Sequence, residues 1–514
     1  MADDEPSGDG PEPRAREALP AVELRFERGR RAVGLLVGPG LFVLLLVLPV
    51  AGLSAPAARL AAVLALVLTW WITEAIPIPV TAVLGAALSV VCGVGTAREM
   101  FAPFGDPIVF LFLGSFLLAG AMAETGLDRR FVLSLLAVPR AGASPFRILA
   151  LIGLGVAGLS LWLSNTATAA MVLPVAVGTL SVLSPWLGQE PGRSRYAASL
   201  MLVVAYSASI GGVATPVGSP PNLIVLGQLR TLGGVSLSFL QWMALGLPVA
   251  AVLLAVLLLS SRRSSRTVAV DGTGFRDFVA SERARLGPWT REEVHTLVAF
   301  SIAVVLWVLP GVLTLALGAT HPVVGALQAH VPEAVVAMLA ASLLFLPIRG
   351  DVGRRSTATW SLAARVDWGT LLLFGGGLSL GAALFRTGLA TAVGDALVAW
   401  TGAGSLVAIT FLFAVLSILL TEAISNTAAA TMVCPLAIAA AQSAGVSPVA
   451  PAVTVALQCS MAFMLPVSTP PNAIVYGTGR VTILQMIRKG VTLDLAALAV
   501  IPPLVLGLCH GMGL

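Results

Sequence analysis

The chain contains few charged residues for its length. Only 11% of its 514 residues are charged, whereas 57% are hydrophobic, and the mean hydropathy is +0.95. Soluble globular domains carry about 25% charged residues, so this composition excludes a soluble protein and indicates a polytopic membrane protein surrounded by lipid. The net charge of +5 does not indicate a nucleic-acid partner, because the basic residues lie in short loops between apolar segments.

Residues that build disulfides, metal centres and catalytic sites are also scarce. The four cysteines, Cys92, Cys434, Cys459 and Cys509, have no C-x-x-C spacing, so neither a disulfide framework nor a cysteine metal site is predicted. The four histidines lie at the ends of apolar segments or in loops, which leaves no imidazole relay across a membrane. The apolar segments contain no HExxH motif, clustered Asp pair or Ser with a nearby His. We therefore expect a protein that is not an enzyme and has no organic cofactor.

The apolar runs divide the chain into five parts. Residues 1–31 are rich in Pro, Gly, Glu and Arg without an apolar face, and we predict a disordered cytoplasmic tail there. A first transmembrane helix is expected over 32–56, followed by a first repeat over 57–260, a cytoplasmic linker over 261–292 and a second repeat over 293–514. The linker is too short to build a core of its own, which excludes a soluble domain at this place.

Apolar runs of about 20 residues, the length that spans a bilayer, recur along both repeats. After the first helix, the expected spans are 57–75, 78–95, 108–125, 197–226, 238–260, 293–317, 331–348, 368–389, 448–477 and 491–511. Two further regions, 146–183 and 405–441, each consist of two half-spans, which is typical of hairpins that enter and leave the membrane by the same side. The expected fold is an all-α membrane protein with about 11 transmembrane helices and two re-entrant hairpins.

Two polar motifs occur twice, in the same order. Ser164-Asn165-Thr166 precedes Gly218-Ser219-Pro220-Pro221-Asn222, and Ser425-Asn426-Thr427 precedes Ser468-Thr469-Pro470-Pro471-Asn472. Such interruptions of apolar helices at membrane depth are tolerated only where they line a cavity. Because each repeat contains an odd number of spans, the second repeat must be inverted relative to the first. Inverted repeats with broken helices are a common architecture of secondary transporters.

These interruptions combine groups that bind anions with groups that bind cations. A helix that starts at Asn165 or Thr166 presents unpaired amide groups and the positive end of its dipole, which suits an anionic ligand. The Ser, Asn and Thr side chains, and the carbonyl groups freed beside the prolines, supply neutral oxygens for a sodium ion. The alternative is structural, because Ser and Thr in membrane helices commonly bond only to their own helix. The duplication favours a binding site.

The distribution of basic residues predicts the orientation. Lys489 is the only lysine, and an eleven-span topology places almost all basic residues on one side. The exceptions are Arg59, Arg98, Arg230 and Arg386. By the positive-inside rule, the amino terminus is cytoplasmic and the carboxyl terminus external, in a bacterial-type inner membrane.

The segment from Cys459 to Val475, CSMAFMLPVSTPPNAIV, and both Ser-Asn-Thr motifs resemble the signatures of the divalent anion:sodium symporter family, the solute carrier 13 group. The resemblance covers the chain from about Ala32 to its end. It implies a homodimer in which a transport domain moves like an elevator against a fixed scaffold. It also implies a small dianionic substrate that is transported together with sodium ions.

The resemblance assigns roles to individual residues. It implies one sodium site at Ser160, Ser164, Asn165 and the backbone of Gly218, and a second at Thr421, Ser425, Asn426 and the backbone of Ser468. It implies that the substrate contacts Asn165, Thr166, Ser219, Asn426, Thr427, Thr469 and Pro470. Ser160 and Thr421 each precede the serine of their tripeptide by four residues. In a helix, each would therefore lie on the same face as that serine, one turn earlier.

The predicted function is sodium-coupled import of a dianion, foremost a C4-dicarboxylate such as succinate, malate or fumarate. Sulfate and citrate are alternative substrates, and a sodium-independent anion exchanger is the alternative class. No arginine lies inside either Ser-Asn-Thr region, so sodium ions and helix dipoles are expected to offset the substrate's charge. Glu422 is an intramembrane carboxylate and hence a candidate proton carrier, although a structural role in the hairpin is the favoured interpretation.

Overall fold

The computed structural model describes residues 21–48, 52–139, 141–186, 194–265, 272–347 and 356–514. Within these ranges all regular structure is helical, apart from one isolated β-bridge between Pro347 and Ser356. The prediction of an all-α protein is therefore confirmed.

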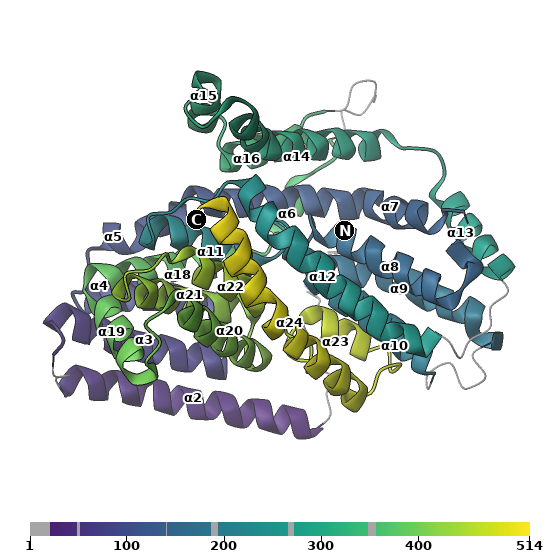
Figure 1. Cartoon of the computed structure of the whole chain (residues 1–514). Coiled ribbons are helices and arrows are strands. Elements are labelled where there is room, and N and C mark those ends of the chain that lie inside the picture. Colours follow the sequence, from purple (N-terminus) through teal and green to yellow (C-terminus); the bar gives the residue numbers. More distant parts are fainter. Residues whose placement is uncertain (1–20, 49–51, 140, 187–193, 266–271, 348–355) are drawn as a thin grey trace, which may run out of the picture.

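The first helix is longer than predicted. α2 (Ala21–Val47) begins at Ala21 rather than at Ala32, so residues 21–31 are helical and not disordered. Alanine, glutamate, leucine and arginine are strong helix formers, and they dominate this extension. Residues 1–20 of the predicted tail lie outside the described residues. In Figure 1, α2 runs along one edge of the molecule, opposite α14 (Arg291–Leu317), α15 (Pro322–His330) and α16 (Glu333–Leu343).

The same order of elements occurs in both halves of the chain. The first half contains α6 (Pro107–Thr125), α7 (Leu127–Leu136), α8 (Pro145–Ser160), α9 (Asn165–Leu183), α10 (Arg195–Gly212), α11 (Pro220–Leu232) and α12 (Phe239–Ser265). The second contains α18 (Trp368–Arg386), α19 (Leu389–Thr401), α20 (Leu406–Ala423), α21 (Asn426–Ser443), α22 (Val449–Cys459), α23 (Pro470–Tyr476) and α24 (Ile483–Met512). Gly126 and Gly388 mark the same junction, with φ angles of 75° and 79° that favour glycine.

The remaining elements precede the first series, lie within it or connect it to the second. They are α3 (Ala55–Thr73), α4 (Ile78–Val91), α5 (Ala97–Phe101), α13 (Gly272–Leu286), α17 (Trp360–Ala364) and three short 3₁₀ helices at Ala102–Gly105, Ala141–Ala143 and Ser184–Trp186. The linker predicted over 261–292 thus contains a helix of its own, α13.

The number of long apolar helices differs from the eleven expected spans. Among the described residues, nine helices are long and apolar enough to cross a membrane, or ten if α15 and α16, bent by 58°, form one span. The expected spans 197–226 and 448–477 are each divided into two shorter helices, because a Pro-Pro motif prevents one continuous hydrogen-bonded ladder. Conversely, α9 and α20 of the hairpins are each long enough to be counted as spans.

α10 and α22 form the centre of the fold. All residues of α22 are buried, as are all but Arg195 and Ser199 of α10. Helices that are apolar all round lie inside a bundle, and α10 packs against α8, α9 and α12, whereas α22 packs against α20, α21 and α24. The central helices therefore hold the hairpins in place. Their carboxyl ends lead directly into the non-helical segments that separate α10 from α11 and α22 from α23.

Candidate substrate and cation site

Each Ser-Asn-Thr tripeptide starts the second helix of a hairpin. Ser164 and Ser425 are the N-cap residues, and Asn165 and Asn426 are the first residues of α9 and α21. Serine is favoured at an N-cap because its hydroxyl can accept a hydrogen bond from the first turn, as the Ser164 hydroxyl does from the Ala167 amide at 3.3 Å. Other amide groups of the first turn have no acceptor within the helix, so both tips can bind an anion.

The two Pro-Pro motifs start α11 and α23, the second halves of the broken helices. Ser219 and Thr469 are the N-cap residues, and the prolines occupy the first two helical positions, where a missing amide hydrogen costs no helical bond. The Thr469 hydroxyl accepts a hydrogen bond from the Asn472 amide at 3.4 Å, whereas the Ser219 hydroxyl lies 3.1 Å from that of Ser460.

The asparagine of each Pro-Pro-Asn motif holds the preceding loop. The side-chain amide of Asn222 donates to two carbonyl oxygens at 2.9 and 2.8 Å, and that of Asn472 donates to two carbonyl oxygens at 3.0 Å. In both loops these carbonyls lie ten and seven residues before the asparagine; they belong to Gly212, Thr215, Ala462 and Leu465. Two loops distant in sequence are thus fastened in the same way.

Oxygen atoms converge behind the first hairpin tip. The Ser160 hydroxyl donates to Asn165 Oδ1 at 2.8 Å. A methyl group added at Gly218 would lie 2.6 Å from the carbonyl oxygens of Gly212 and Ser160 and 2.9 Å from that of Leu161. Neutral oxygens gathered at this density are the ligands that hard cations such as sodium prefer. The carbonyls of Gly212 and Leu161 extend the predicted set, and no side-chain motif in the sequence pointed to them.

The second hairpin tip has equivalent contacts. The Thr421 hydroxyl lies 2.7 Å from Asn426 Oδ1 and 2.5 Å from the carbonyl oxygen of Cys459. In the first half, the Ser160 hydroxyl makes the corresponding second contact with the carbonyl oxygen of Ala208, at 2.7 Å. Each half therefore joins a hydroxyl from the first hairpin helix, an amide oxygen from the second, and a carbonyl from a central helix.

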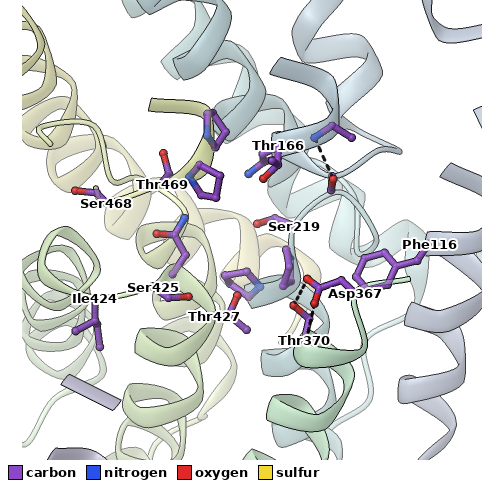
Figure 2. A pocket seen from close by; sticks show the side chains of 18 of the residues that line it. Phe116, Thr166, Ser219, Asp367, Thr370, Ile424, Ser425, Thr427, Ser468 and Thr469 are labelled. Atoms are coloured by element: carbon purple, nitrogen blue, oxygen red, sulfur yellow. Dashed lines mark hydrogen bonds between the residues drawn. The ribbon is translucent and has the colours of Figure 1, made fainter. Parts of the chain in front are cut away.

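Both tips and both Pro-Pro turns open onto one cavity of about 950 Å³ (Figure 2). Its lining includes every residue predicted to contact the substrate: Asn165, Thr166, Ser219, Asn426, Thr427, Thr469 and Pro470. Of the residues predicted to bind sodium, Ser164, Ser425 and Ser468 also line it. Ser160, Gly218 and Thr421 do not, because they are buried behind the lining. The structure thus separates a layer of polar residues that lines the cavity from a second layer behind it.

The opposite wall of the cavity belongs to residues that the sequence did not single out. Phe116 and Gly120 of α6 line it, as do Asp367 and Thr370 at the start of α18. Figure 2 shows Phe116 and Asp367 on the side of the view opposite Ser468. Asp367 caps α18 by accepting hydrogen bonds from the Thr370 amide at 3.0 Å and from its hydroxyl at 2.6 Å. An Asp before an apolar helix signals an N-cap, but nothing local to these segments signals a cavity.

The chain matches known proteins in sequence and in structure. Residues 31–514 match the family model described as the sodium:sulfate symporter transmembrane region. The chain belongs to this family of divalent anion:sodium symporters.

Curated relatives agree with the assignment. The sodium-dependent dicarboxylate transporter SdcS of Staphylococcus saprophyticus is 34% identical over 479 residues, covering 91% of this chain and 89% of that protein. SdcS of Staphylococcus aureus is 32% identical over 494 residues, covering 93% and 92% of the two chains. The YdaH transporter of Alcanivorax borkumensis, of known crystal structure, matches with a TM-score of 0.56 at 16% identity over 90% of this chain and 99% of its own, which supports the fold. The symporter is a multi-pass membrane transporter and not an enzyme.

Two arginines of the symporter line the cavity, although neither lies inside a Ser-Asn-Thr region. Arg30 and Arg365 both contribute to the lining. Each is paired with a carboxylate, Arg30 with Glu74 at 3.2 Å and Arg365 with Glu124. They come from segments far from the tripeptides in sequence, which is why inspection of the tripeptide regions missed them. The tips themselves contain no arginine, and the two pairs carry no net charge.

Glu422 of the symporter is held inside the second hairpin. Its Oε1 accepts hydrogen bonds from the amides of Phe463 and Met464 at 2.6 and 3.0 Å, and its Oε2 accepts one from the Ser468 hydroxyl at 2.8 Å. The carboxylate thereby ties α20 to the loop between α22 and α23. These contacts agree with the structural role favoured from the sequence.

Proposed function

We propose that this symporter imports a C4-dicarboxylate, such as succinate, malate or fumarate, together with sodium ions. The observation that carries the proposal is the two-layer arrangement, in which both hairpin tips open onto one cavity with the oxygen clusters of Ser160 and Thr421 directly behind them. The two staphylococcal relatives are sodium-dependent dicarboxylate transporters, which supports the substrate class and the coupling ion.

The chemistry of the two layers fits a dianion and its cations. Two helix amino termini, of α9 and α21, offer two separate places for the two carboxylates of one molecule. A dianion without cations would carry uncompensated charge through a low-dielectric barrier, which is costly. Sodium ions bound at the Ser160 and Thr421 clusters would offset this charge from close by, because only the side chains of Asn165 and Asn426 separate these clusters from the cavity. Movement of the loaded site then requires both ligands, which is coupling.

We further propose that the amino terminus is cytoplasmic and that the described conformation opens to the cytoplasm, because the cavity reaches Arg30, Glu74 and Arg365 on the side that the positive-inside rule assigns to the cell interior. A cysteine introduced between 272 and 286 is expected to react with an impermeant reagent only from the cytoplasmic side, and one at His321 only from outside. The reverse labelling pattern would overturn the orientation.

An elevator movement and a homodimer, both implied by the family resemblance, complete the proposal. The hairpins and central helices would move together against a scaffold that includes α6, which supplies the opposite wall of the cavity. Cross-linking of purified protein in lipid nanodiscs tests the oligomeric state. A purely monomeric species would contradict the proposed homodimer.

Uptake into proteoliposomes tests the function. Labelled succinate is expected to accumulate only when an inward sodium gradient is present. Sulfate, which the family description names, and citrate serve as competing substrates. Stronger accumulation of sulfate or citrate would reassign the substrate. Exchange of succinate that proceeds equally well without sodium would replace symport by anion exchange.

Separate roles are expected for the layer that lines the cavity and the layer behind it. Thr421→Ala should raise the sodium concentration needed for half-maximal transport, while Thr469→Ala should weaken substrate affinity. Each lost hydrogen bond to a charged ligand should cost roughly 1.5 to 3 kcal/mol, or about ten- to a hundredfold in affinity. Because the ligands bind cooperatively, the deciding quantity is succinate affinity at saturating sodium. It should recover in Thr421→Ala and stay weak in Thr469→Ala, and equal losses would contradict the division.

A further inference from the structure

A second buried carboxylate lies beside Glu422. Asp494 of α24 is 5% exposed and Glu422 is 6% exposed, and neither lines the cavity. The Asp494 carboxyl interacts with that of Glu422, and both lie within Coulombic range of the Tyr206 hydroxyl. Gly490, one turn before Asp494, allows this approach, since a methyl group there would lie 2.5 Å from the carbonyl oxygen of Phe463.

The two carboxylates differ in how they are satisfied. Glu422 accepts three hydrogen bonds, which is the environment of an ionised group. Neither oxygen of Asp494 receives a well-formed hydrogen bond from the described residues. A buried acceptor without a partner is costly, and a buried charge without one more so. Asp494 therefore has more free coordination capacity than Glu422, whose carboxylate keeps about one of its four lone-pair sites unused.

No basic side chain in the described part of the chain neutralises the pair. The ion pairs found there involve other carboxylates, and Lys489, the nearby lysine of α24, donates instead to the Ser260 hydroxyl at 2.6 Å. One further oxygen, the Tyr206 hydroxyl, lies near the pair. The Tyr206 hydroxyl donates to the carbonyl oxygen of Phe463 at 2.8 Å, which leaves its own lone pairs available.

We propose that Asp494 and Glu422, with the Tyr206 oxygen, hold a further monovalent cation, a sodium ion, in addition to the two predicted sites. Two carboxylates in a low-dielectric interior require a counter-charge, and an all-oxygen set suits a hard cation. An ion here would fix the loop between α22 and α23, whose Ser468 hydroxyl bonds to Glu422 and whose backbone contributes to the second predicted sodium site. A sodium ion at the Asp494–Glu422 pair would thus favour the binding of another sodium ion at the second predicted site.

The inference rests on the proposed sodium coupling, so its test begins with the wild-type protein. Equilibrium binding of radioactive sodium at saturating succinate is expected to give one ion per protomer more than the two predicted sites. The ratio of sodium to succinate transported into proteoliposomes should exceed two in the same way. A wild-type protein that needs no sodium would defeat the proposed function itself. A sodium-coupled protein that binds only two ions would overturn this inference alone.

Variants then locate the ion. Asp494→Asn keeps the shape of the side chain but removes its charge, and it is expected to bind and transport one sodium ion fewer than the wild type. Asp494→Ser provides a second variant with the same expectation. Asp128→Asn is the matched control, because Asp128 is also buried and has an unpartnered oxygen but lies on α7. It should keep the wild-type ratio.

Two other outcomes are decisive. If Asp494→Asn keeps the sodium ratio and only loses a pH dependence of uptake, the pair shares a proton and the sodium proposal is wrong. If the Asp494 and Asp128 variants lose the same amount of sodium binding, the effect comes from removing any buried carboxylate. The proposal is wrong in that case too.

Discussion

Sodium-dependent uptake should be abolished by Asn165→Ala and equally by Asn426→Ala, in proteins that still fold. Each asparagine lines the cavity and also contacts the hydroxyl behind it, Ser160 or Thr421, at 2.8 and 2.7 Å. The change therefore removes an oxygen from the cation cluster and an amide from the substrate site at once. Each lost contact with a charged ligand should cost roughly 1.5 to 3 kcal/mol, so the combined fall in uptake should be about a hundredfold or more.

Initial rates of succinate uptake measure this effect, and the melting temperature reports folding. Ser342→Ala is a suitable control, because the Ser342 hydroxyl is exposed and bonds only to its own helix, at the Met338 carbonyl. It should transport at the wild-type rate. Near-normal uptake by either asparagine variant would show that the tips are not the binding site.

Gly218→Ala is expected to be nearly as damaging, through the opposite physical change. The added methyl group would lie 2.6 Å from two carbonyl oxygens, closer than real side-chain carbons approach. It would force these oxygens apart and occupy space beside the cation. Overpacking of this kind costs roughly 1 to 3 kcal/mol, which predicts an approximately ten- to hundredfold higher sodium requirement.

The sodium concentration for half-maximal uptake is the quantity to measure. Gly507→Ala in α24 is the matched control, since a methyl group there meets no atom within 4 Å. It should leave the sodium requirement unchanged. If Gly218→Ala instead weakens succinate binding at saturating sodium and leaves the sodium requirement intact, Gly218 belongs to the substrate layer and the cation cluster is misplaced.

Much of this site could be predicted from the sequence, because its polar residues interrupt apolar helices. A tripeptide such as Ser425-Asn426-Thr427 stands out where lipid-compatible residues are the rule, and its repetition removes the ambiguity of a single motif. The α10–α11 break was foreseeable from Pro220 and Pro221 for the same reason. These features depend on local chemistry, which a sequence displays directly.

Other features depend on contacts between distant segments. Phe116 and Arg365 line the cavity, yet one lies in a uniformly apolar helix and the other in a loop, so neither attracts notice in the sequence. Asp494 likewise depends on a contact between distant segments. It is one acidic residue inside a long apolar helix, and only the packing of α24 against α20 and α22 brings it to Glu422. The early start of α2 at Ala21 is a further departure, because the strong helix formers of residues 21–31 outweigh the charge that favours disorder there.

The asparagine clamps give the cation clusters a property of their own. Asn222, in the first turn of α11, fastens the Gly212 carbonyl oxygen of the first cluster, and Asn472, in the first turn of α23, fastens two carbonyl oxygens of the loop before it. The positions of these oxygens are therefore set by protein bonds before any ion arrives. Coordinating oxygens with a fixed spacing select cations by ionic radius, because the spacing cannot widen for a larger cation without breaking those hydrogen bonds. Competition of potassium with sodium would measure this stiffness directly. We therefore expect the Asn222 amide, which holds the Gly212 oxygen of the first cluster, to favour sodium over potassium without touching the ion.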